Sequence, residues 1–167
     1  MQRFKSFQNL QIKRHSILRL SLVIATLALF LVSCKSLKTA VFDQYSYQQS
    51  ISIKVESLNL MDNAIETYAE NEVEVQALLL DLQKMVEYEK NKPDNKVSYS
   101  MWQVITDKER NLLAGFLKRW KEKNQLSKVF IDETKLQVSE ALDLIIKYEA
   151  NKNKTNESNI LNFITNN

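Results

Sequence analysis

The stretch that decides the fold is residues 72–92, EVEVQALLLDLQKMVEYEKNK, in which apolar side chains recur at intervals of three and four. The residues that share this phase are Val75, Leu79, Leu82 and Val86. Residues three and four apart lie on one face of an α-helix, so the spacing predicts an amphipathic helix with a heptad-like, coiled-coil-type stripe.

The same phase continues upstream, through Tyr47, Ile51, Leu58, Met61, Ile65 and Tyr68. Residues 43–92 contain neither Gly nor Pro, so one interpretation is a single helix of about 50 residues. That helix would pack with a helical hairpin and would need a second chain to cover its stripe. A break near Glu70–Glu72 gives the preferred fold class, an all-α antiparallel four-helix bundle. Its segments are similar in length: 43–69, 72–92, 100–124 and 127–151.

Local signals place the remaining helix ends. Pro93-Asp94-Asn95 predicts the one clear turn. Thr106 and Glu109 fit a capping box, which predicts a helix start at Thr106, with Ser100–Ile105 as a short separate turn. Ser127 is the expected N-cap of a last helix ending near Asn151. The buried faces predicted for these two helices are Leu112, Leu113, Phe116, Leu117 and Trp120, and Ile131, Val138, Leu142, Ile145 and Tyr148.

Composition excludes several classes of protein. The chain has 167 residues but only one each of Gly, Pro, Cys and His. Turn-rich sandwiches, barrels and propellers depend on Gly and Pro, and a phosphate-binding loop needs several glycines. One Cys excludes an intrachain disulfide framework and a zinc finger.

The N-terminal segment has the pattern of an export signal. Five basic residues and no acidic residue precede an uncharged apolar run of 13 residues, Leu20–Val32. A helix that crosses a bilayer needs roughly 20 such residues, so the run suits the core of a signal peptide better than an anchor.

The run ends in Leu31-Val32-Ser33-Cys34, which resembles the lipobox of bacterial lipoprotein precursors. The resemblance implies cleavage between Ser33 and Cys34, a diacylglycerol on the Cys34 thiol and a fatty acyl group such as palmitate on the new amino terminus. Several acyl chains on one residue give a stable membrane anchor, whereas one chain gives only a marginal one. In the lipoproteins that this segment resembles, an Asp after the lipidated Cys retains the protein on the inner membrane. The resemblance therefore implies that Lys35 favours the periplasmic face of the outer membrane.

Four regions are therefore expected: a signal peptide at 1–33, a lipid-proximal tether at 34–42, a helical bundle at 43–151 and a disordered Asn-rich tail at 152–167. Removal of the signal peptide takes away five of the 23 Lys and Arg residues and none of the 20 acidic ones, which changes the formal charge from +3 to −2. The tail contains an apolar island formed by Ile160, Leu161, Phe163 and Ile164. We interpret it as a frayed end that touches the bundle; the alternative is a docking motif for a partner.

Candidate catalytic residues are few. The only His lies in the expected signal peptide and Cys34 is the expected lipid site, which excludes catalytic triads, Cys nucleophiles and His-ligated metals in the mature chain. The acidic run Glu70, Glu72 and Glu74 is interpreted as a solvated face, and the basic and aromatic stretch 116–123 as core plus helix C-terminus. No catalytic residue, cofactor or metal is expected.

These features predict a non-catalytic, membrane-anchored helical lipoprotein of the bacterial cell envelope. It would act as a protein-binding accessory or assembly factor, with an envelope protein or a second copy as partner and neither nucleic acid nor a small-molecule substrate inferred. The alternative is an inhibitory or exclusion lipoprotein of the immunity type. A third possibility is an envelope hydrolase that uses a carboxylate pair.

Overall fold

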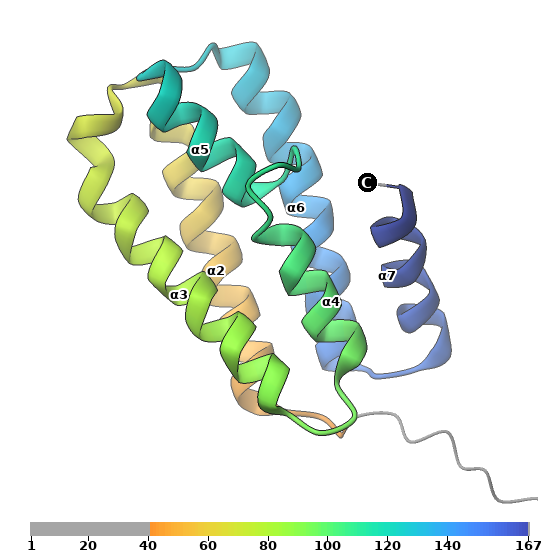
Figure 1. Cartoon of the computed structure of the whole chain (residues 1–167). Helices are drawn as coiled ribbons and strands as arrows, with labels where there is room; N and C mark the ends of the chain where they lie inside the picture. Colours follow the sequence, from red (N-terminus) through yellow and green to blue (C-terminus); the bar gives the residue numbers. More distant parts are fainter. Residues whose placement is uncertain (1–40, 167) are drawn as a thin grey trace, which may run out of the picture. The chain divides into compact units, whose positions relative to one another are not determined.

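The computed structural model describes residues 41–166, which form six α-helices, two short 3-10 helices and no strand (Figure 1). The helices are α2 (Gln44–Asp62), η1 (Asn63–Ile65), η2 (Tyr68–Asn71), α3 (Glu72–Asn91), α4 (Lys96–Ile105), α5 (Leu113–Lys123), α6 (Lys128–Ala150) and α7 (Lys154–Asn166). The all-α expectation is confirmed for this range. The expected signal peptide, the lipobox with Cys34 and most of the tether lie outside the described residues.

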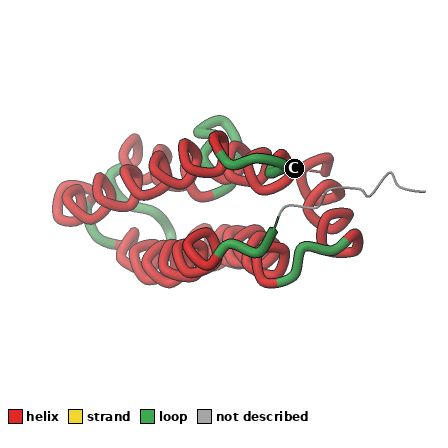
Figure 2. The backbone as a smooth tube through the Cα atoms, turned by 90° about the horizontal axis from the view of Figure 1, so that it is seen from below, coloured by secondary structure: helices red, strands yellow, loops and turns green. Residues whose placement is uncertain are grey.

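The long helices pack around one apolar core. In Figure 1, α3, α4 and α5 lie in front of α2 and α6, and the view from below shows two layers of helices (Figure 2). Helix α2 contacts α3 and α6, α4 contacts α3 and α6, and α7 packs against α4 and α6. The largest side chains in the core are Trp102, Trp120, Phe116, Met61, Leu82 and Leu142.

The chain between residues 43 and 92 forms two helices, so the single long helix is wrong. The helical path is interrupted at residues 63–71, somewhat earlier than expected. Thr67 and Glu70 form a capping box there, in which the Thr67 N–H donates to Glu70 Oε2 at 3.1 Å. The break is also tied to the α5–α6 connection by the Tyr68 N–H, which donates to the Asn124 carbonyl at 2.8 Å.

The third predicted helix is divided into α4 and α5. Thr106 is the C-cap of α4 rather than an N-cap, and its hydroxyl donates to the Trp102 carbonyl at 2.8 Å. The predicted capping box therefore does not form, and α5 begins only at Leu113. The expected apolar faces of α5 and α6 are all buried, and Ser127 caps α6 as predicted.

The only Gly of the chain explains how the connection packs onto α5. A Cβ added at Gly115 would lie 1.8 Å from the Arg110 carbonyl oxygen, which is far inside contact distance. The connection can therefore fold back over the first turn of α5 because residue 115 has no side chain.

The C-terminal tail is a helix and not a disordered segment. Helix α7 buries Ile160 completely, while Phe163 and Ile164 are partly buried against the same core. The Asn153 side chain accepts a hydrogen bond from the Asn156 N–H at 2.9 Å, which caps the start of the helix. The apolar island thus packs onto the folded domain.

The buried face of α2 differs from the predicted stripe. Ile51 and Ile65 are exposed, whereas the buried positions are Ser46, Ser50, Ile53, Ser57, Leu60 and Met61. Half of this face consists of serines, which a search for apolar periodicity does not detect. The hydroxyl of Ser50 donates to the Ser46 carbonyl at 2.7 Å, so this polar group is satisfied within the helix.

Candidate functional site

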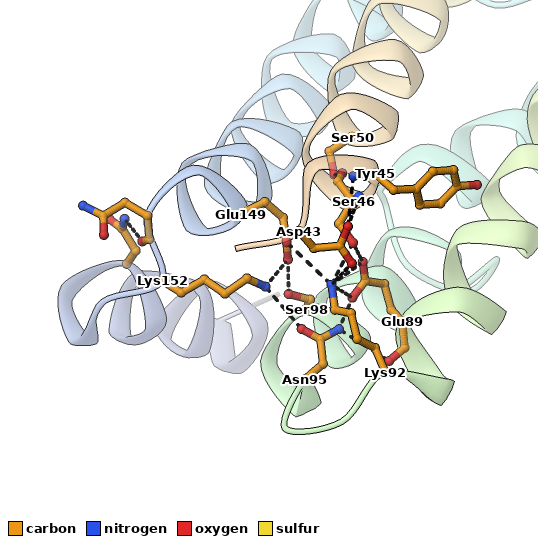
Figure 3. Close-up of polar contacts among 12 residues, drawn as sticks. Asp43, Tyr45, Ser46, Ser50, Glu89, Lys92, Asn95, Ser98, Glu149 and Lys152 are labelled. Atoms are coloured by element: carbon orange, nitrogen blue, oxygen red, sulfur yellow. Dashed lines mark hydrogen bonds and ion pairs between the residues drawn. The ribbon is translucent and has the colours of Figure 1, made fainter. Parts of the chain in front are cut away.

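A buried polar cluster lies at the end of the domain where α2 begins, α3 ends, α4 begins and α6 ends (Figure 3). We call it the tether-end cluster, because the chain from the expected tether enters the fold there. Its members are Asp43, Ser46, Glu89, Lys92, Asn95, Ser98, Glu149 and Lys152.

Helix ends bring these side chains together. Asp43 is the N-cap of α2, and its Oδ1 accepts from the Tyr45 N–H at 2.9 Å. The turn at Pro93 and Asp94 reverses the chain between α3 and α4, with Asp94 at a φ of 55°. That reversal places Lys92 and Asn95 on the two sides of one tight connection.

Glu89 is held by three donors. Its side chain is 0% exposed and accepts hydrogen bonds from the Ser46 hydroxyl and the Asn95 amide. Lys92 Nζ lies 3.1 Å from Glu89 Oε2 and 3.3 Å from Oε1. A buried carboxylate is tolerated only when it is paired and hydrogen-bonded in this way.

Glu149 is the second buried carboxylate. Its Oε1 accepts from the Ser98 hydroxyl and from Lys152 Nζ, the latter at 2.8 Å. Its Oε2 accepts no hydrogen bond from the described residues and lies 3.8 Å from Lys92 Nζ. This oxygen is therefore stabilised by charge alone.

Lys92 connects three of the four elements. Besides both glutamates, it reaches the Ser46 hydroxyl at 2.7 Å and Asp43 Oδ2 at 3.4 Å. Lys152 extends the network to the Asn95 side-chain oxygen at 3.3 Å. With all groups ionised, the three carboxylates exceed the two ammonium groups by one negative charge.

The environment shifts several pKa values. Burial, reinforced by the charge of Glu149 and opposed by the Ser46 hydrogen bond and Lys92, raises the pKa of Glu89. Partial burial would raise the pKa of Asp43, but hydrogen bonds from Tyr88 and Ser46 and the charge of Lys92 lower it overall. Burial, with the charges of nearby glutamates, raises the pKa of Tyr148 to about 12.

The two buried carboxylates of the cluster are closed to a substrate. Glu89 and Glu149 are 1% and 0% exposed. Two hollows of about 640 and 630 Å³ lie on the described surface, and neither carboxylate lines them, although the second reaches the edge of the cluster at Lys92. The larger one lies between α3 and the α4–α5 connection, where Leu79, Gln83 and Thr106 are among its lining residues.

The acidic run at 70–74 does not converge. Glu70 is engaged in the capping box, Glu72 lies 3.9 Å from Lys121 Nζ, and Glu74 is exposed. Within residues 41–166, no group of three or more His, Cys, Asp or Glu side chains could hold a metal ion.

The basic and aromatic stretch at 116–123 is largely structural. Trp120 is fully buried, and its indole N–H donates to the Glu66 carbonyl at 3.1 Å. Arg119 lies over the Phe130 ring, with its guanidinium carbon 4.8 Å from the centroid. Both contacts are made within the domain.

Sequence reasoning missed the two buried glutamates, although the sequence carries a signal for both. Glu89 lies four residues after the buried Met85 and therefore falls on the buried face of α3. Glu149 lies four residues after Ile145 on the buried face of α6. An acidic residue at a position where the helical spacing predicts a buried apolar side chain indicates a buried ion pair.

Among the helices of the described range, none is long and apolar enough to cross a bilayer. No protein-family model matches the chain, and comparison with curated proteins and with solved structures finds no similar protein.

Proposed function

We propose that the protein is a lipid-anchored helical lipoprotein of the bacterial cell envelope that acts by binding another protein. The observation that carries the proposal is Cys34, the only Cys of the chain, at the lipobox position after the apolar run Leu20–Val32. An acylated Cys34 would hold the helical domain at a membrane surface, on the periplasmic face of the outer membrane.

The connection between anchor and domain is short. Asp43, the N-cap of α2, lies nine positions after Cys34, and a fully extended chain of nine residue steps spans at most about 30 Å. The tether-end cluster joins this first residue of the fold to α3, α4 and α6. We propose that the cluster fixes the tethered end of the domain mechanically.

The contacts between the helices define the scaffold of the domain. We propose that it is an elaborated antiparallel four-helix bundle in which α4 and α5 together take the place of the third helix. In support, the contacts α2–α3, α3–α4, α4–α6 and α6–α2 close a ring. The two buried carboxylates are ion-paired and shielded from solvent, which favours a structural role for them over the hydrolase alternative.

Proximity labelling in the native envelope tests the binding role. A labelling enzyme fused after Asn167 is expected to mark a specific envelope protein, or a second copy of the chain, in membranes of the source bacterium. The matched control is Cys34→Ala, which leaves the sequence of the described domain unchanged, removes the lipid and is expected to leave the precursor unprocessed. Recovery of the same background proteins from both forms, with no self-association, would contradict the proposal.

A further inference from the structure

Aromatic side chains gather where the chain enters the fold. Phe42, Tyr45 and Tyr88 are 56%, 42% and 39% exposed, and Tyr47 is partly exposed beside them. We call these four residues the aromatic tip. They come from the entry and first turn of α2 and from the last turn of α3.

Contacts within the tip fix its rings in place. The Tyr45 and Tyr88 ring centroids are 4.6 Å apart, and those of Phe42 and Tyr47 are 6.1 Å apart. The Tyr88 hydroxyl donates to Asp43 Oδ2 at 2.7 Å, which ties the tip to the tether-end cluster. Rings held in this way lose little conformational freedom when they bind a surface.

The chemistry of the tip suits the head-group region of a bilayer. Aromatic rings that carry a polar group are enriched where one end of the side chain is apolar and the other is hydrated. Lys84 and Lys90, on the same helix as Tyr88, are 56% and 54% exposed, but they form ion pairs with Asp81 and Glu87 and so add no net charge beside the tip. The tether, residues 34–42, contains two lysines and no acidic residue, which suits an anionic lipid surface.

The length of the tether indicates that lipid, and not a protein, contacts the aromatic tip. If Cys34 is acylated, the first residue of α2 stays within about 30 Å of the bilayer, so lipid is present at high effective concentration. A protein partner at the same place would compete with this surface.

We propose that the aromatic tip docks onto the lipid surface and orients the domain, with the α5–α6 connection at the opposite end pointing away from the membrane (Figure 1). This inference rests on the proposed lipid anchor. It adds a second, reversible contact with the membrane to the covalent one.

Site-specific fluorescence quenching tests the docking. Acylation occupies Cys34, so a Cys introduced into the full-length protein is its only free thiol. A fluorophore at Gln44→Cys, beside the tip, is compared with one at Gln125→Cys in the α5–α6 connection; both positions are exposed. The protein is purified from membranes and reconstituted into vesicles of phosphatidylethanolamine and phosphatidylglycerol that carry a head-group nitroxide quencher. Several-fold stronger quenching at residue 44 is expected.

A tip variant separates docking from mere proximity to the tether. Phe42→Ser with Tyr45→Ser is expected to stay on the vesicles but to lose most of the quenching at residue 44. The matched control is Ile51→Ser with Val55→Ser, which removes two exposed apolar side chains elsewhere on α2 and is expected to keep the quenching.

Each other outcome is decisive. Protein that floats with the vesicles but shows equal quenching at residues 44 and 125, or quenching that the tip variant does not change, overturns the docking and leaves the anchor intact. Protein that does not float with the vesicles overturns the anchor, and the docking with it.

Discussion

Glu89 shows at the scale of one residue how the domain depends on pH. Burial raises its pKa, so the folded domain takes up a proton there at a higher pH than the unfolded chain does. Lowering the pH through this raised pKa therefore stabilises the fold. Asp43 acts in the opposite sense, because its pKa is lowered in the folded domain. The stability that ionised Asp43 contributes is lost as the pH falls below 3.8, its ordinary value, and through the lower pKa of the folded domain.

The free energy of unfolding is thus expected to rise as the pH falls through the raised pKa of Glu89 towards 4.5, the ordinary value of a glutamate, and to fall in stronger acid. Urea denaturation at a series of pH values measures it. Glu89→Gln is expected to abolish the rise, whereas Glu87→Gln, on the exposed side of α3, is expected to keep it. A wild-type domain that loses stability steadily below neutral pH would refute this role of Glu89.

Gly115 decides, at the scale of an element, how α4 and α5 are joined. Alanine favours a helix interior over glycine by about 1 kcal/mol, so propensity alone would make Gly115→Ala stabilising. The Arg110 carbonyl, 1.8 Å from the added Cβ, requires the backbone of the connection to move. We expect a net destabilisation of about 1–3 kcal/mol, as for other overpacked sites, measured by urea denaturation. A variant as stable as wild type would show that the connection does not pack there.

Helix α7 is attached to the domain mainly through Ile160. This is the one fully buried residue among the described part of the helix, and the neighbouring Leu161 is 45% exposed. Ile160→Ala is expected to cost about 2–5 kcal/mol and to release α7 first, because Phe163 and Ile164, which also pack against the core, are only partly buried.

Hydrogen exchange measures this release. Amides of residues 154–166 are expected to lose protection in Ile160→Ala while those of α3 and α6 keep theirs. Leu161→Ala, a matched change on the exposed side, is expected to leave the pattern unchanged. Equal effects of the two substitutions would mean that α7 is not anchored by Ile160.

The elements also show what apolar periodicity can predict. It located α3, α5 and α6 because their buried faces consist of large apolar side chains. It misplaced the face of α2, where serines occupy half of the buried positions. It also overlooked α7, since the low complexity of the tail masked Ile160, Phe163 and Ile164, which have helical spacing.

The capping signals show a second limit. Thr106 with Glu109 and Thr67 with Glu70 have the same spacing, yet only the second pair forms a capping box. Tertiary contacts decide between them: the Trp120 indole and the α5–α6 connection bind the backbone around Thr67, whereas the Thr106 hydroxyl completes α4. The buried ion pairs of the tether-end cluster depend in the same way on contacts between residues distant in sequence.

At the scale of the whole molecule, charge and location are linked. The positive surplus of the chain lies in residues 1–33, and the remainder carries a formal charge of −2. This slightly negative charge disfavours binding to nucleic acid, which depends on a basic surface, and it leaves membrane attachment to the proposed lipid anchor.

The central claim is that Cys34 carries the membrane anchor, and mass spectrometry of the protein purified from membranes tests it most directly. We predict an N-terminal peptide that begins at Cys34 and carries diacylglycerol and an amide-linked acyl chain. Cells that express Cys34→Ala are predicted to accumulate the precursor without incorporating labelled palmitate. An N-terminal peptide that retains Ser33, or palmitate incorporation that persists in Cys34→Ala, would contradict the account.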